Sequence, residues 1–239
     1  MIVVKNSLVI KSAFIVGKTA SPVSTGGSMS FSGLSTSNLS IPNDVDFRFG
    51  TGNFTIEWFQ YLDSTAGSFP RIFSIGTYSG QNIAVSLEGS SSGRTFYFWG
   101  SGAISFGSIS SGLNNTWNHF AITREGTNLK LFRNGTQFGT TKTNSTDFNN
   151  TTFALRIGNE TTTSSGAAFK GQITNFRWVK GVALYTSDFA VPTSPLSATA
   201  QTKLLLLATD AATVSTDSSG NNKVVTNNNV TFSSNKPFS

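Results

Sequence analysis

The stretch NLKLFRNGTQFGTTK constrains the fold of this chain more than any other. Asn134-Gly135 is the pair favoured in two-residue β-hairpin turns, because both central positions of such a turn need positive φ. Counting outward from the turn places three apolar side chains on one face: Leu129, Leu131 and Phe138. The pattern therefore predicts two antiparallel strands whose apolar face is turned toward a core.

The same alternation of apolar and polar residues recurs upstream. In NFTIEWFQYL, Phe54, Ile56 and Trp58 share one face. Thr55 and Glu57 point to the opposite, outer face. Because side chains alternate with a period of two in a strand, this segment is predicted to lie half in the core.

Further short strands are predicted along the rest of the chain. In TWNHFAITREGTN, Phe120 and Ile122 point inward, whereas His119 and Ala121 point outward. RIFSIG, IAVSLEG and TFYFWG read as three more strands, and LLLLA as a fully buried one. No long window shows apolar residues at helical spacing. The pattern is typical of an antiparallel sandwich or barrel, so we expect an all-β fold.

The composition indicates a folded chain and limits its chemistry. Of 239 residues, 37% are hydrophobic, 21 are Phe and only 12% are charged, which argues against disorder. The chain has no cysteine, which excludes disulfides, thiolate zinc sites and cysteine nucleophiles. The net charge is +6, but the cations are scattered singly. Nucleic-acid grooves usually carry clustered cations, so we expect no nucleic-acid partner.

The N-terminal segment differs from the rest of the chain. MIVVKNSLVIKSAFIVG is apolar but is interrupted by Lys5 and Lys11, so it predicts neither a signal peptide nor a membrane insertion. GKTASPVSTGG follows with a linker composition. We expect residues 1–27 to form an arm that docks on a partner, and residues 28–239 to form one domain. The alternative is that the arm adds an edge strand to its own sandwich.

Three longer segments carry a family resemblance. They are SFSGLSTSNLSIPNDVDFRFGTGNFTIEWFQY, NTWNHFAITREGTNLKLFRNGTQFGTT and FKGQITNFRWVKGVALYTSDFAVPTSPL. Together they resemble the laminin G-like, concanavalin A-like jelly-roll domains of phage and other virus structural proteins, over roughly residues 28 to 235. The resemblance implies an antiparallel β-sandwich. It also implies that Phe176, Val179 and Tyr185 are packing residues, and that Arg177 and Lys180 are exposed.

Catalytic motifs are not evident in the sequence. Some relatives with this jelly roll cleave glycans with a Glu-x-Asp-x-x-Glu strand, and none of the 11 acids is arranged that way. GSSSG (89–93) matches the nucleophile-elbow pattern, but the one histidine, His119, follows it without an acid between residues 92 and 118. We read His119 as a structural histidine, and we expect no enzymatic activity.

Two kinds of binding site are considered. Oxygen ligands suit Ca²⁺, which makes Asn43, Asp44 and Asp46 a candidate calcium site; the alternative is that they are solvated turn residues. A glycan site needs exposed aromatic rings with polar groups beside them. The candidate glycan-binding residues are Tyr78, Gln81, Trp99, Asn159, Arg177 and Lys180. Trp58 and Trp117 are assigned to the core.

Two functions fit these expectations. The first is a non-enzymatic virion surface protein, for capsid decoration or associated with the tail or fibre, whose jelly roll binds host or environmental glycans. Its partner would be a capsid or tail protein bound through residues 1–27, and assembly in a host cytoplasm needs neither a signal peptide nor cysteines. The second is an extracellular lectin module that acts by itself. A homo-oligomer is compatible with either function.

Overall fold

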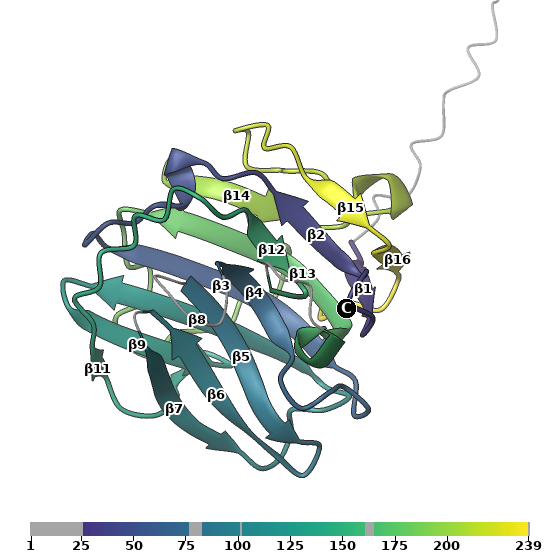
Figure 1. Cartoon of the computed structure of the whole chain (residues 1–239), viewed down its shortest axis with the longest axis horizontal. Helices are drawn as coiled ribbons and strands as arrows, with labels where there is room; N and C mark the ends of the chain where they lie inside the picture. The colour runs from purple at the N-terminus through teal and green to yellow at the C-terminus, as the bar shows by residue number, and fades with distance from the viewer. Residues whose placement is uncertain (1–25, 77–82, 101, 161–164, 239) are drawn as a thin grey trace, which may run out of the picture.

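The computed structural model describes residues 26–76, 83–100, 102–160 and 165–238 (Figure 1). Within these ranges helix is confined to three short 3₁₀ turns: η1 (Val45–Phe47), η2 (Ser165–Ala167) and η3 (Ala211–Thr213). None of these is long or apolar enough to cross a membrane. The strands are β1 (Ser28–Ser32), β2 (Asn38–Ile41), β3 (Phe54–Leu62), β4 (Arg71–Ile75), β5 (Ile83–Ser90), β6 (Gly93–Trp99), β7 (Ala103–Ile109), β8 (Trp117–Glu125), β9 (Asn128–Arg133), β10 (Thr136–Gln137), β11 (Lys142–Thr143), β12 (Leu155–Ile157), β13 (Lys170–Lys180), β14 (Thr202–Leu206), β15 (Thr226–Asn228) and β16 (Thr231–Ser233).

Two antiparallel sheets pack face to face, and Figure 1 shows one in front of the other. Sheet A has nine strands, with the order β10-β9-β8-β3-β13-β1-β16, in which β14 also pairs with β13 and β11 with β9. Sheet B has seven strands, with the order β15-β2-β12-β4-β5-β6-β7. Neighbours in the sheets are often far apart in sequence, as in other jelly rolls. The predicted antiparallel β-sandwich is confirmed.

The predicted hairpin forms between β9 and β10. Asn134 and Gly135 both adopt positive φ, at 51° and 79°. Beyond the turn, the backbone N–H of Phe138 donates to the carbonyl of Leu131, at 2.8 Å. Leu129 and Leu131 are fully buried, and Phe138 packs against the core, so the predicted register and apolar face are both confirmed.

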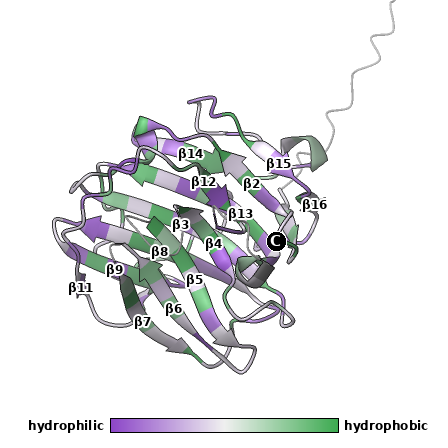
Figure 2. Ribbon diagram, viewed as in Figure 1, coloured by the Kyte–Doolittle hydropathy of each residue, from purple (hydrophilic) through white to green (hydrophobic). Residues whose placement is uncertain are grey.

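The core between the sheets is built mainly from aromatic rings. Trp58 of β3 and Trp178 of β13 are fully buried, and both contact Phe73 of β4 edge-on, with ring centroids 5.9 and 5.7 Å away. Figure 2 shows hydrophobic residues along the strands of both sheets. Each of these two aromatic pairs contributes about 0.5–1.5 kcal/mol of stability beyond the burial of the apolar surface of the rings. The inward assignment of Trp58 is therefore confirmed.

A β-bulge in β13 sets which side chains of this strand reach the core. The pairing with β3 shifts between Thr174 and Arg177, where Asn175 adopts a positive φ of 53°. The extra residue resets the alternation, so Phe176 and Trp178 both point inward and are fully buried. Without the bulge, the alternation set by the first half of β13 would turn Phe176 and Trp178 away from the core.

The outer face of sheet A is covered by residues 182–199, which we call the strap. The hydroxyl groups of Thr55 and Thr123 donate to the carbonyls of Val182 and Tyr185, at 3.1 and 2.8 Å. The rings of Tyr185 and Phe189 stack 3.7 Å apart. Outward-pointing residues of sheet A that lie under the strap, such as Thr55 and Thr123, are therefore buried instead of facing water.

Two predictions about sheet A are wrong as a result. Arg177 was expected to be exposed, but only 7% of it is accessible because it lies under the strap beside Glu57. Trp117 was assigned to the core, but it lies on the outer face and is partly exposed. It alternates in phase with His119, opposite Tyr61, so the parity of β8 turns it outward.

Other predictions fall on different parts of the chain. Leu204, Leu205 and Leu206 of LLLLA lie in β14 and are buried as predicted, whereas Leu207 lies beyond the strand and is partly exposed. Residues 1–25 of the predicted N-terminal arm lie outside the described residues. The docking of that arm stays a prediction.

Candidate functional site

The outer face of sheet B presents two aromatic side chains from one strand. Trp99 and Tyr97 lie two residues apart on β6, so they point to the same side, while Phe96 and Phe98 are buried in the core. The ring centroids of Trp99 and Tyr97 are 6.0 Å apart, with a tilt of 37°. Both side chains are partly exposed, so β6 presents an aromatic surface outside the sandwich.

A chain of hydrogen bonds holds Trp99 in place. Its Nε1 donates to Oγ of Ser86 on β5, at 2.9 Å. The hydroxyl of Ser86 donates to Oε1 of Glu88, also at 2.9 Å. Arg71 of β4 donates from Nη1 to the same carboxylate oxygen at 2.9 Å, and its guanidinium lies 5.2 Å from the centroid of the Trp99 ring. The hydrogen bond at Nε1 therefore fixes the ring of Trp99, and the guanidinium of Arg71 contacts this ring.

A second carboxylate lies on the other side of this guanidinium. Oε2 of Glu160 is 3.8 Å from Nε of Arg71. The side chains of Glu88 and Glu160 are 20% and 12% exposed, whereas that of Arg71 is 5% exposed. Water and ligands can therefore reach the acceptor oxygens beside Trp99 more readily than the cation between them.

Strand register explains why these residues meet. Arg71 of β4 is paired with Ser86 of β5, which is in turn paired with Tyr97 of β6. The three therefore form one row across the outer face. Glu88 and Trp99 lie two residues further along β5 and β6 and point to the same side. We call the group formed by Arg71, Ser86, Glu88, Tyr97, Trp99 and Glu160 the Trp99 face.

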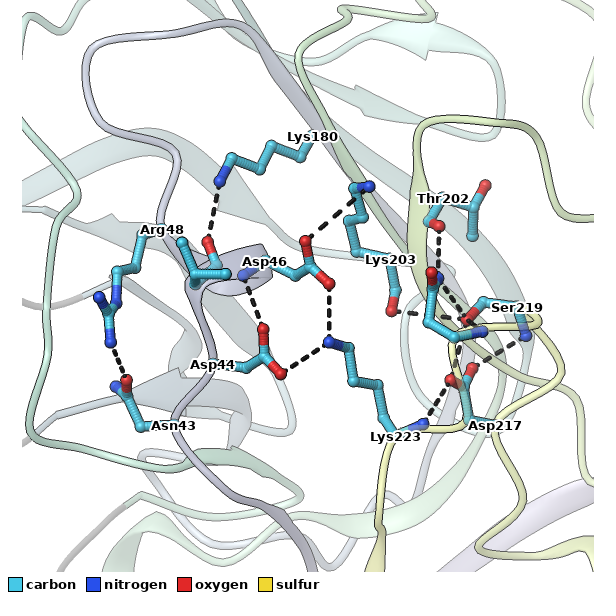
Figure 3. Close-up of polar contacts among 12 residues, drawn as sticks. Asn43, Asp44, Asp46, Arg48, Lys180, Thr202, Lys203, Asp217, Ser219 and Lys223 are labelled. Atoms are coloured by element: carbon cyan, nitrogen blue, oxygen red, sulfur yellow. Dashed lines mark hydrogen bonds and ion pairs between the residues drawn. The ribbon is translucent and has the colours of Figure 1, made fainter.

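Two of the three predicted calcium residues, Asp44 and Asp46, contact a lysine (Figure 3). Nζ of Lys223 lies 2.7 Å from Oδ2 of Asp44 and 2.7 Å from Oδ2 of Asp46, and Lys203 approaches Asp46 to 3.8 Å. The hydrogen bond from the Asp46 backbone, together with Lys223, lowers the pKa of Asp44. Burial lowers the pKa of Lys223, but its bonds to the two carboxylates outweigh burial and raise it.

The third predicted calcium residue is engaged elsewhere. The Asn43 amide donates to the carbonyls of Asn150 and Phe153, at 3.2 and 2.9 Å, and its side-chain oxygen accepts from Arg48 at 2.6 Å. Among the described ranges, no group of three or more His, Cys, Asp or Glu side chains is suited to a metal ion. Calcium binding at Asn43, Asp44 and Asp46 stays a prediction, and it would require Lys223 to move.

The sequence of this chain matches the model of a known protein family. A family model described as the concanavalin A-like lectin/glucanases superfamily matches residues 32–188, about two thirds of the chain. The chain belongs to this superfamily. The family resemblance predicted from the sequence is thus confirmed. A search of curated proteins finds no match.

Solved structures share the concanavalin A-like fold at low identity. A candidate carbohydrate-binding protein from Bacteroides ovatus ATCC 8483 superposes with a TM-score of 0.64 and 16% identity, over 90% of this chain and 61% of that one. A heptameric SAP-like pentraxin from Limulus polyphemus gives 0.51 and 16%, over 68% and 79%. The enzymatically active domain of tailspike protein 2 from bacteriophage CBA120 gives 0.51 and 13%, over 68% and 27%. The chain thus spans less than two thirds of the Bacteroides protein.

The predicted glycan-binding residues of this concanavalin A-like chain do not form one group. Trp99 lies on the outer face of sheet B, as described. Asn159 is fully buried; its side-chain oxygen accepts from the backbone N–H of Glu160 at 2.8 Å, so it positions Glu160. Arg177 and Lys180 belong to β13 in the other sheet, where Lys180 donates to the carbonyl of Val45 at 2.8 Å. Tyr78 and Gln81 lie outside the described residues.

Most of the Trp99 face was missed at the sequence level. Arg71, Ser86, Glu88 and Tyr97 occur in RIFSIG, IAVSLEG and TFYFWG, the three strands that alternation did predict. Extending the alternation of TFYFWG puts Tyr97 beside Trp99, so this residue could have been found. Arg71, Ser86 and Glu88 depend on the register between strands, which no local pattern encodes.

Proposed function

We propose that the chain is a non-enzymatic carbohydrate-binding domain whose ligand binds to the Trp99 face. The observation that carries the proposal is the partly exposed ring of Trp99, which is fixed through Ser86 to the Glu88–Arg71 pair. The description of the Bacteroides ovatus structure as a candidate carbohydrate-binding protein supports the same ligand class through the shared fold.

The chemistry of the Trp99 face suits a saccharide. The flat C–H face of a sugar ring can stack on the rings of Trp99 and Tyr97. Its hydroxyl groups can donate to the carboxylate of Glu88, whose side chain is 20% exposed at the edge of the aromatic surface. Fixed rings and fixed acceptors lose little conformational freedom when a ligand binds, which favours affinity.

The absence of catalysis is part of the proposal. The sequence lacks the Glu-x-Asp-x-x-Glu strand of the glycan hydrolases with this fold. Glu88 and Glu160 both approach the guanidinium of Arg71, so each carboxylate already serves to hold that cation. We therefore expect a saccharide to leave the Trp99 face unchanged.

We further propose that this domain is displayed on a virion surface. The support is the sequence resemblance to virus structural proteins, together with a fold that is shared with a phage tailspike domain. Residues 1–27 would dock on a capsid or tail protein. Sedimentation tests this placement: the protein should co-sediment with purified particles, and a chain found only in the soluble fraction would contradict it.

A glycan array tests the proposed ligand class. Binding by the wild type should weaken roughly fivefold in Trp99→Ala, as expected for the loss of one stacking ring. Leu34→Ala is the control, because Leu34 is an exposed apolar residue that belongs neither to the Trp99 face nor to sheet A. An array without binding, or equal binding by wild type and folded Trp99→Ala, would refute the proposal.

A further inference from the structure

A hollow lies on the outer face of sheet A, whereas the Trp99 face belongs to the outer face of sheet B. It encloses about 370 Å³ where β3 and β8 meet the strap and the C-terminal residues. Its lining includes Phe59, Trp117, His119, Thr193 and Phe238. We call it the His119 cavity. A volume of this size falls in the range of small-ligand sites.

His119 is the polar group of this cavity that has an unused hydrogen-bonding atom. The residue is 1% exposed, and its Nε2 lies 3.1 Å from Oε2 of Glu57. Its Nδ1 is buried and has no hydrogen-bond partner among the described residues. Buried polar atoms are nearly always paired, so an unpaired one beside a cavity points to a missing partner.

The hydrogen bonds of Glu57 indicate which kind of partner Nδ1 of His119 lacks. Its carboxylate also accepts from Nε of Arg177 at 2.8 Å and from the hydroxyl of Tyr185 at 2.9 Å. An ionised carboxylate only accepts hydrogen bonds, so Nε2 of His119 must carry a proton. In the neutral ring Nδ1 then has a free lone pair. With the ring in this neutral form, the partner that Nδ1 lacks is a hydrogen-bond donor.

The walls of the cavity are aromatic and ordered by contacts of their own. The ring of Phe59 lies 4.7 Å from that of His119 and 5.0 Å from that of Phe238. Nε1 of Trp117 donates to Oδ1 of Asn235 at 3.1 Å, which fixes the indole at the rim. A ligand here meets apolar ring surfaces on its sides, and His119 forms part of the wall.

The His119 cavity adjoins another hollow. A neighbouring hollow of about 430 Å³ shares Asn134 with it and is lined by polar side chains that include Arg133 and Gln137. A ligand longer than one unit can therefore extend from the aromatic cavity onto a polar surface. This combination suits a short chain of polar rings better than a single compact molecule.

We propose that the His119 cavity is a second saccharide site, in which a sugar hydroxyl or acetamido N–H donates to Nδ1 of His119. The ligand class rests on the proposed function, but the site itself rests on the unpaired nitrogen and the aromatic walls. A purely apolar ligand would leave Nδ1 buried without a partner, and an anion would place a second acceptor against it.

The single histidine makes the test specific. The ¹⁵N resonance of the His119 ring can be followed at fixed pH while cellotetraose or N,N′-diacetylchitobiose is added to the full chain. We expect a saturable shift of the Nδ1 signal with at least one of these probes. No shift with either probe would overturn the proposal.

Two exposed neighbours on the strap provide a matched pair of variants. Thr193 lines the cavity and Ser194 does not, although both are exposed. Thr193→Trp should fill the cavity and abolish the shift, whereas Ser194→Trp should leave it intact. A shift that survives in folded Thr193→Trp, or that disappears equally in both variants, would overturn the proposal. Trp117→Ala should weaken binding about fivefold without loss of fold.

The variant Trp99→Ala separates this site from the proposed function. It should weaken binding on the array and leave the His119 shift unchanged. If the array result fails while the shift persists and is blocked by Thr193→Trp, the second site stands and the Trp99 face does not. If Trp99→Ala removes the His119 shift, the cavity is not an independent site and the proposal is wrong.

Discussion

The carboxylate of Glu57 and the guanidinium of Arg177 form an ion pair that is buried outside the sandwich core. Nε of Arg177 lies 2.8 Å from Oε1 of Glu57, and Nη2 contacts the same oxygen. The side chain of Glu57 is fully buried and that of Arg177 is 9% exposed. His119 and Tyr185 complete the hydrogen bonding of Glu57. The outer face of sheet A is thus a second, polar interior beneath the strap.

Replacing Glu57 should destabilise the chain. Glu57→Gln leaves the charge of Arg177 buried without a counter-ion, and breaking a buried pair in this way costs about 3–5 kcal/mol of unfolding free energy. Urea denaturation measures the change. Glu125→Gln, at the exposed end of β8, is the control and should have little effect. Equal stability of the two variants would show that the buried pair contributes nothing.

Acid should also destabilise the chain by protonating Glu57. Burial raises the pKa of Glu57, but its bonds to His119 and the charge of Arg177 outweigh burial and lower it below the ordinary value of 4.5. The folded state therefore favours the ionised form. Its contribution to stability is present above pH 4.5 and is lost as the pH falls through the lower folded-state pKa.

Denaturation curves over this acidic range provide the check. The free energy of unfolding of the wild type should fall more steeply than that of Glu57→Gln, because the variant lacks the titrating carboxylate. Asp44 and Asp63 also have lowered pKa values, so both proteins retain a shared decline. Parallel curves would contradict the assignment.

The stability of the chain at alkaline pH should depend on the hydroxyl of Tyr185. Burial and the neighbouring charge of Glu57 raise the pKa of its hydroxyl well above the ordinary value of 10. The folded state favours the protonated form, so the contribution to stability is present below pH 10 and is lost as the pH rises above it. Tyr185→Phe should cost about 1–2 kcal/mol at neutral pH, because Glu57 loses a donor.

The same variant should lose less stability than the wild type above pH 10. The comparison isolates one hydroxyl, since phenylalanine keeps the stacking on Phe189. Thermal unfolding of both proteins between neutral and alkaline pH measures the difference. An unchanged gap across this range would show that Tyr185 does not titrate in the folded chain with a raised pKa.

Much of the fold was predictable because its signals are local. The Asn134-Gly135 turn fixes a hairpin and its register, and a period of two turns Trp58 inward. The strand of Trp117 was also found, yet the ring was assigned to the core because large aromatics usually lie there. Its parity with His119 contradicted that assignment and proved the better guide.

The sites were less predictable because they depend on contacts between distant segments. Burial of Arg177 requires the strap, which is held near its end where the side-chain oxygen of Asn175, at the bulge, accepts from the backbone N–H of Leu196 at 2.6 Å. Glu160 reaches Arg71 only through the register of sheet B and the support of Asn159. Trp99 was found because a tryptophan that ends a strand is visible locally.

The final prediction concerns Lys223, whose ammonium bridges Asp44 and Asp46 at 2.7 Å. Lys223→Met removes the cation that both carboxylates share and leaves Lys203 beside Asp46, at 3.8 Å. Because the carboxylates are 33% and 24% exposed, we expect a modest loss of about 1 kcal/mol. Two such oxygen ligands suit Ca²⁺, which no longer has to displace an ammonium group. Added Ca²⁺ should therefore raise the melting temperature of Lys223→Met more than that of the wild type. Lys236→Met, which alters another lysine near the C-terminus, controls for the change in net charge. A wild type that responds to Ca²⁺ at least as strongly as Lys223→Met, or no response in either protein, would contradict a site that Lys223 occupies.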